Sequence, residues 1–222
     1  MSVPGRVLNC EPDPHERDVF YKEHADRAYS TTSFFIAYLV CEVPFEIVTC
    51  FLFAILADLV VGLPRTPEVF FTIAANVFLI TNTGESIGII FNTWFEHTGF
   101  SINITSSVLS IGVLMSGILS TDMPRVLEGV NYISPLRYVV RSLVPASLDG
   151  VKFSCLEWQR LPGGRCPIET GEDVKKLYGF VEKAPWKNLV VLAALAVVYR
   201  ALAFGVVAAR RAQWGVGRLG KA

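Results

Sequence analysis

Two long apolar runs separated by four residues constrain the fold of this chain more than any other feature. The first extends from Ser33 to Leu63, and the second begins at Glu68, after the short segment Pro-Arg-Thr-Pro. About 20 apolar residues are enough for a helix to cross a bilayer, and so short a connection can only be a tight turn. The sequence therefore predicts a transmembrane helical hairpin.

Acidic side chains lie inside both apolar runs. They are Glu42, Glu46 and Asp58 in the first run and Glu85 in the second. An ionisable group within a membrane span is costly, and it faces either the interior of a helical bundle or a water-filled cavity. The main question that the hairpin raises is therefore what these acids face.

The rest of the chain has the charge distribution of a polytopic membrane protein. Hydrophobic residues make up 52% of the chain, and charged residues gather in three polar segments outside the apolar runs. We expect an all-α membrane bundle with four transmembrane helices, at about residues 34–61, 70–91, 100–119 and 189–207. Pro44 lies within the first span and should bend it.

The polar segments suggest what lies outside the membrane. Residues 16–30 are helical in composition and amphipathic enough to lie along a membrane surface, with an ordinary solvated helix as the alternative. Residues 122–187 form a long loop that prolines divide into short helices. Residues 1–15 are expected to be a disordered or truncated lead-in.

Polar and small side chains form a stripe along the second and third predicted spans. Asn82 and Glu85 belong to the stripe on the second span, and Ser110 to the stripe on the third. Such residues either pack helices together or line a polar cavity. For the third span both interpretations stay open.

Basic residues near the span ends predict the orientation. Four spans place both chain ends on one side, and that side carries most of the Lys and Arg close to the membrane. Basic loops stay on the cytosolic side. We therefore expect both termini, including a tail at residues 212–222, to be cytosolic, and residues 122–187 to lie outside or in a lumen.

This orientation allows a disulfide in the outer loop. Cys155 and Cys166 lie on the oxidising side, where disulfides persist. Two free thiols, or a bridge to another chain, are the alternatives. None of the five cysteines has the spacing of a zinc site, so no metal site is predicted.

The sequence contains no motif for hydrolytic chemistry. It has neither a Walker A glycine loop nor a Gly-x-Ser-x-Gly segment, and its three histidines form no ligand pattern. The formal net charge of zero gives no indication of a nucleic-acid partner. We do not expect the chain to be an enzyme, so energy for any work it does must come from elsewhere.

Short motifs in a fixed order resemble the ABCG (White/pigment-precursor) family of ABC transporters, in particular its fungal members. The resemblance extends from about Glu16 to Arg211. The motifs are Glu-Arg-Asp-Val-Phe-Tyr-Lys-Glu at 16–23, Glu-Val-Pro at 42–44, Gly-Glu-Ser at 84–86, Ser-Gly-Ile-Leu at 116–119 and Tyr-Ile-Ser-Pro-Leu-Arg-Tyr at 132–138.

The resemblance implies a fold in which this chain is the C-terminal part of a transmembrane domain, spanning residues 16–211. Residues 16–30 would be a coupling helix, and the outer loop would contain an extracellular re-entrant helical segment. The ATPase domain and the first two membrane helices of the family would not be included. The chain would then be a fragment, a split gene product or a truncated gene model.

The resemblance also implies roles for individual residues. The coupling helix would contact the ATPase domain through Glu16, Arg17 and Glu23. A gate between the substrate cavity and an outer vestibule would consist of Ile118 and Leu119.

Further roles follow in the same way. The substrate cavity would be lined by Asn82, Glu85, Ser110 and Val113. Glu42 and Glu85 would belong to an intramembrane polar network that needs a partner, either Asn82 or a residue on a helix outside this chain. Cys155 and Cys166 would pair as a disulfide.

The function that the resemblance implies is ATP-driven export of lipids, sterols or amphipathic xenobiotics by alternating access in a homo- or heterodimer. ATP and magnesium would be bound by a nucleotide-binding domain, and no cofactor by this chain. The plasma membrane is the favoured location, with an internal membrane as the alternative. The rival interpretations are a non-transporting membrane scaffold and an unrelated four-span, channel-like protein.

Overall fold

A computed structural model describes residues 31–61, 66–95, 97–117, 124–153, 166, 168–180 and 185–219. The described part is helical apart from turns, short connections and one isolated antiparallel bridge between Lys152 and Thr170. Its helices are α2 (Thr31–Val61), α3 (Pro67–Trp94), α4 (Thr98–Met115), α5 (Arg125–Asn131), α6 (Pro135–Ser147), α7 (Gly171–Leu177) and α8 (Pro185–Leu219). The prediction of an all-α membrane bundle is confirmed.

Three helices are long and apolar enough to cross a membrane, and their apolar stretches are Leu39–Val60, Pro67–Trp94 and Trp186–Arg210. They correspond to the first, second and last predicted spans. The third prediction, residues 100–119, falls on α4, whose apolar stretch Gly99–Met115 is shorter. At roughly 1.5 Å per residue this stretch is about 25 Å long, somewhat less than the hydrocarbon core of a bilayer. Residues 118–123 lie outside the described part.

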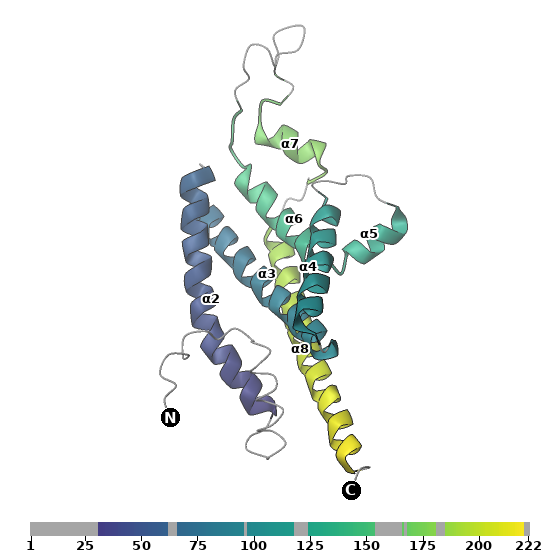
Figure 1. Cartoon of the computed structure of the whole chain (residues 1–222). Helices are drawn as coiled ribbons and strands as arrows, with labels where there is room; N and C mark the ends of the chain where they lie inside the picture. The colour runs from purple at the N-terminus through teal and green to yellow at the C-terminus, as the bar shows by residue number, and fades with distance from the viewer. Residues whose placement is uncertain are drawn as a thin grey trace.

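The second span, α3, lies at the centre of the bundle. It begins at Thr66, whose side chain accepts a hydrogen bond from the Val69 backbone N–H, and Pro67 occupies its first turn. Its neighbours are α2, α4, α6 and α8, as Figure 1 shows. Because α3 has partners on several sides, its polar stripe is buried among helices rather than exposed.

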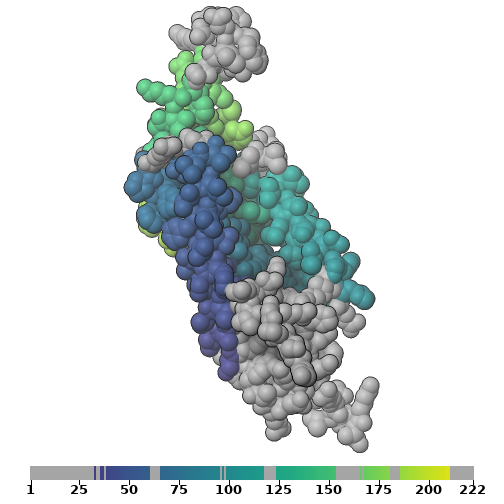
Figure 2. Space-filling view, turned by 60° about the vertical axis from the view of Figure 1, so that its left-hand side comes forward, coloured from purple at the N-terminus to yellow at the C-terminus, as the bar shows by residue number. Residues whose placement is uncertain are grey.

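The first span, α2, is apolar over most of its exposed surface and runs along one face of the molecule (Figure 2). Phe45, Val48 and Leu52 are 53%, 58% and 56% exposed. A soluble protein would bury such a surface, whereas a bilayer covers it without cost. Only a narrow side of α2 is buried, and that side carries Glu42, Glu46, Cys50 and Ala54.

The helix α6 enters the bundle between α3 and α8. The Ser142 hydroxyl on α6 donates a 2.7 Å hydrogen bond to Asn76 Oδ1 on α3. On the other side, the Asn188 amide of α8 donates to the Arg141 carbonyl. Both bonds join α6 to membrane-spanning helices, as expected for a re-entrant segment.

The bundle has two distinct ends. In Figure 1, α2 begins and α8 ends at the same end, and α7 lies beyond the other. At the first of these ends, the Arg210 side chain donates to the Trp94 carbonyl, which is at the end of α3. At the far end, Lys175 and Asp149 form a 2.9 Å ion pair.

Candidate functional site

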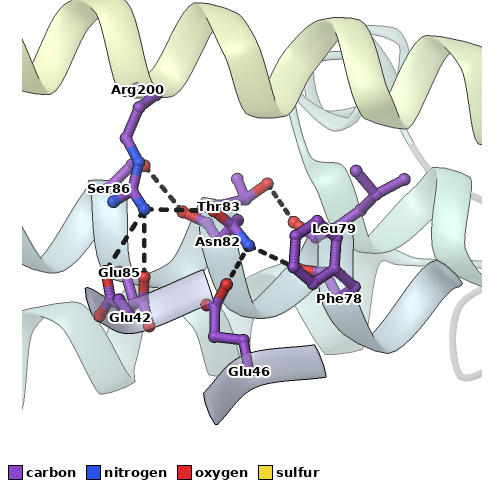
Figure 3. Close-up of polar contacts among 9 residues, drawn as sticks. All are labelled: Glu42, Glu46, Phe78, Leu79, Asn82, Thr83, Glu85, Ser86 and Arg200. Carbon is purple, nitrogen blue, oxygen red and sulfur yellow. Dashed lines mark hydrogen bonds and ion pairs between the residues drawn. The ribbon is translucent and has the colours of Figure 1, made fainter. Parts of the chain in front are cut away.

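Five polar side chains from three helices meet inside the bundle, and we call them the intramembrane cluster. Glu42 and Glu46 come from α2, Asn82 and Glu85 from α3, and Arg200 from α8 (Figure 3). The first two are four residues apart and the next two are three apart, so each pair lies on one face of its helix. Helical spacing therefore delivers two pairs of side chains to one place.

Arg200 is the centre of the cluster. Its Nη2 atom lies 3.4 Å from Glu85 Oε2, 3.5 Å from Glu42 Oε2 and 3.1 Å from Asn82 Oδ1. A guanidinium group is always charged and presents several donors in a fixed plane, so it can contact several acceptors at once. One side chain of α8 is thereby tied to both helices of the predicted hairpin.

Asn82 connects the two halves of the cluster. Its carbonyl oxygen accepts from Arg200, and its amide nitrogen donates to Glu46 Oε2 at 2.6 Å and to the Phe78 carbonyl at 3.2 Å. The oxygen of the amide therefore faces the positive group and its nitrogen faces the negative one. This arrangement uses both ends of the side chain.

The cluster is largely buried in the described bundle, and its most exposed acidic side chain, Glu85, is 24% exposed. Glu42 and Glu46 are 8% and 7% exposed, and the Arg200 side chain is 14% exposed. Charges in such a place interact strongly because little solvent screens them. Removal of one partner would leave the opposite charge buried and uncompensated, which is strongly destabilising.

The neighbouring polar residues of α3 do not extend the cluster toward solvent. Thr83 and Ser86 are fully buried, and their hydroxyls donate to carbonyls one turn earlier, those of Leu79 and Asn82. Such back-bonding satisfies hydroxyls in apolar surroundings. These two residues therefore serve close helix packing.

The structure joins only some of the residues that the sequence indicated as a site. Glu42, Asn82 and Glu85 lie together in the intramembrane cluster. Ser110 and Val113 lie on α4 with exposed side chains, and the Ser110 hydroxyl donates to the Ser106 carbonyl of its own helix. No hydrogen bond or ion pair found among the described residues connects them with the cluster.

Several predicted site residues lie outside the part of the chain that the structure describes: Glu16, Arg17, Glu23, Ile118, Leu119 and Cys155. Cys166 is described and disulfide-bonded, whereas Cys41 and Cys50 are free thiols. The pairing of Cys166 with Cys155 stays a prediction. In the described ranges, no group of three or more His, Cys, Asp or Glu side chains is arranged to hold a metal ion.

Sequence reasoning missed Arg200 as the partner of the buried acids and left Glu46 out of the polar network. The signal for Arg200 was present, because it is a single basic residue inside the last predicted span, residues 189–207. Such a residue needs a counter-charge within the bundle. Which acid supplies it depends on the helix neighbours, and these follow from the fold.

Comparison with known proteins adds the family context of this cluster. Residues 14–146 match the family model described as ABC-2 type transporter. An uncharacterized ABC transporter ATP-binding protein/permease of Saccharomyces cerevisiae is 38% identical over 207 residues, which are 93% of this chain and 16% of that protein. The ABC transporter G family member 23 of Arabidopsis thaliana is 28% identical, over 86% of this chain and 30% of its own.

Protein white of Ceratitis capitata is also similar, with 26% identity over 85% of this chain and 28% of its own. The chain thus spans less than a third of the length of these relatives. The family model covers α2, α3 and α6 and ends before α8, the helix that carries Arg200.

Proposed function

The chain belongs to the ABC-2 type transporter family, and we propose that it forms the membrane part of an ABCG-like, ATP-driven exporter. It is an integral membrane domain, and a domain of this family is not itself the ATPase. ATP and magnesium would be bound by a nucleotide-binding domain elsewhere in the transporter. Membership of this family also makes the unrelated channel-like interpretation wrong.

The observation that best supports export is the three-helix connection through Arg200. Its contacts with Glu42 and Glu85 tie α8 to both α2 and α3. A helix bundle held in this way moves as a unit, and alternating access requires such rigid-body motion between two arrangements. The chain before α2 contains the predicted coupling helix, residues 16–30, so α2 is the span through which motion of an ATPase domain would enter.

The exposed side of α4 is the proposed substrate side. Ser110 and Val113 are exposed there, together with the apolar Ile111 and Leu114. A surface with hydroxyls among apolar side chains suits an amphipathic molecule such as a lipid, a sterol or a xenobiotic. We place this side in a cavity shared by two copies or by two related half-transporters.

Other parts of the proposal follow from the resemblance and from charge. Residues 16–211 would be one partial transmembrane domain, and Ile118 with Leu119 would close the cavity toward the outside. The basic residues near the span ends favour cytosolic termini. The plasma membrane is the favoured location, with an internal membrane as the alternative.

Transport itself is the direct test. The tagged chain would be isolated from native membranes with whatever ATP-binding subunit or domain accompanies it and reconstituted into liposomes. The probe is a fluorescent nitrobenzoxadiazole-labelled phospholipid, whose movement is followed with ATP and with a non-hydrolysable ATP analogue. We expect movement that depends on ATP hydrolysis and is abolished by orthovanadate.

A matched pair of variants connects that activity with the cluster. Arg200→Gln should reduce ATP-dependent movement, whereas Arg210→Gln, at the end of the apolar stretch of the same helix, should retain most of it. A preparation that contains an active ATPase but moves neither the labelled phospholipid nor an amphipathic dye would contradict export. That result would favour the membrane-scaffold interpretation.

A further inference from the structure

The intramembrane cluster contains more acidic than basic groups. Glu42, Glu46 and Glu85 supply three carboxyl groups, and among the described residues Arg200 supplies a guanidinium group that contacts Glu42 and Glu85. With every carboxyl ionised, the five described side chains of the cluster would carry a net charge of two negative units. Burial of even one unpaired charge is costly. Within the described residues, the charge count therefore favours a further positive species.

The local geometry indicates where that species would bind. Glu46 is 7% exposed, and its Oε2 atom accepts from Asn82. Its other oxygen, Oε1, is buried and has no hydrogen-bond donor within reach among the described residues. The Glu85 carboxyl group is a close neighbour of both the Glu46 and the Glu42 carboxyl groups. Glu46 and Glu85 thus place two carboxyl groups together, and no described side chain supplies a donor to Glu46 Oε1.

We propose that the cluster is a proton-binding site, in which one proton is held between the carboxyl groups of Glu46 and Glu85. The proton comes from water, and its binding forms an O–H bond on one carboxyl group that donates to the other. Paired carboxyl groups in one site commonly share a proton in this way. The shared proton supplies the missing donor and removes one negative charge.

The remaining charges then balance more closely. Arg200 compensates one of the two carboxylates left, and its contacts with Glu42 and Glu85 are in place for this. Among the described residues, the Cys50 thiol also faces the cluster, one turn after Glu46 on α2. A neutral thiol does not change the net charge of the cluster. The described residues of the site come from α2, α3 and α8.

A proton fits this site better than a metal ion. The described side chains form no group suited to metal coordination, and a guanidinium group already lies among the carboxyl groups. A metal ion would have to bind beside that fixed positive charge and find several oxygen ligands. A proton needs only two oxygens and leaves a neutral acid.

The proposal has a mechanical consequence for α2. The Glu46–Glu85 contact is one of the polar contacts that hold α2 against α3, beside the Glu46–Asn82 bond and the contacts of Arg200. Loss of the proton would place two carboxylates side by side and push α2 away from α3. The packing of the first span would then depend on proton occupancy.

Infrared spectroscopy can detect the proton directly, independently of transport. The full chain, in lipid nanodiscs at neutral pH, would be compared as wild type, Glu46→Gln, Glu85→Gln and the control Glu68→Gln. Glu68 lies exposed in the first turn of α3. We expect the wild type and the control to show the C=O stretch of a protonated carboxylic acid that shifts in heavy water, and either cluster variant to lose it.

Thermal unfolding at increasing pH provides a second measurement. Glutamine has the shape of the protonated acid and can donate the same hydrogen bond, so Glu85→Gln should fold and should lose less stability than wild type as the pH rises. Absence of the acid band at neutral pH, or its persistence in both cluster variants, would overturn the proposal. The proposal would also be overturned if the acid band were absent and the stability depended on sodium concentration. That result would indicate a cation site. Failure of transport would leave all these results unchanged, so the two proposals are tested separately.

Discussion

The hydroxyl of Ser142 on α6 donates a 2.7 Å hydrogen bond to the side-chain oxygen of Asn76 on α3, and both side chains are at most 1% exposed. The Asn76 amide nitrogen in turn donates to the Thr72 carbonyl one turn earlier on α3. A short helix that enters a membrane domain needs such a satisfied polar anchor, because water is excluded there. This bond fixes the depth at which α6 lies between α3 and α8.

We therefore expect Ser142→Ala to weaken the docking of α6. The substitution leaves the Asn76 oxygen buried without its partner, and interhelical bonds of this kind in membranes contribute about 0.6–2 kcal/mol. The loss of stability would be measured by thermal unfolding in detergent. Ser147→Ala is the control, because the Ser147 hydroxyl bonds only to the Val144 carbonyl of its own helix. Equal effects of the two substitutions would contradict an anchoring role.

Arg200→Gln should be among the most destabilising single changes in the bundle. It removes the guanidinium group of α8 that contacts Glu42 and Glu85, and a buried charge left without its partner costs about 3–5 kcal/mol. The loss of stability relative to wild type should be smaller at acidic pH, because protonation neutralises the carboxylates that remain. Unfolding midpoints at neutral and acidic pH would show this. A loss that does not change with pH would indicate packing rather than charge.

Glu85→Ala should impair transport more than membrane insertion. The residue lies at the contact of α3 with α2 and α8, so its loss uncouples the helices without shortening any span. If Glu85 contributes a coupling free energy of roughly 1–3 kcal/mol, its removal should slow ATP-dependent lipid movement at least about fivefold. ATP-dependent lipid movement and the amount of protein extracted from membranes would be measured on the same sample. A fall in both by the same factor would indicate misfolding.

The helix α7 should lose stability in acid. The Thr170 hydroxyl and backbone N–H donate to Asp173 Oδ2 at 2.8 and 3.0 Å, and these bonds lower the pKa of the Asp173 carboxyl below its ordinary value of 3.8. A lowered pKa in the folded state means that the stabilisation is present above pH 3.8 and disappears as the pH falls through the folded-state pKa. Amide hydrogen exchange in residues 171–177 would detect the loss.

Asp173→Asn provides the matching control for that experiment. The amide keeps an oxygen near Thr170 but cannot be protonated in this range. The protection of α7 from exchange, taken relative to the intrinsic exchange rate at each pH, should therefore no longer fall below pH 3.8. If wild type and variant share the same acid dependence, another group is responsible. The capping box at Thr170 and Asp173 would then be of little importance for α7.

Sequence patterns anticipated the spans because they are local. The length of each apolar run determines that a helix can cross the bilayer, and the short link between Leu63 and Glu68 determines that α2 and α3 are adjacent. The same patterns placed acids inside the membrane and predicted that they face a partner. They could not identify that partner, since Arg200 is separated from Glu85 by more than a hundred residues of chain.

What the sequence determined by itself is therefore the three long membrane helices α2, α3 and α8, their order and the presence of buried charge. These properties depend on hydrophobic length and on composition, which are readable one segment at a time. The tertiary structure alone decided that α8 brings Arg200 to Glu42 and Glu85, and that α6 lies against Asn76. Helix packing sets these contacts, because the rotation and depth of each helix are chosen by its neighbours rather than by its own residues.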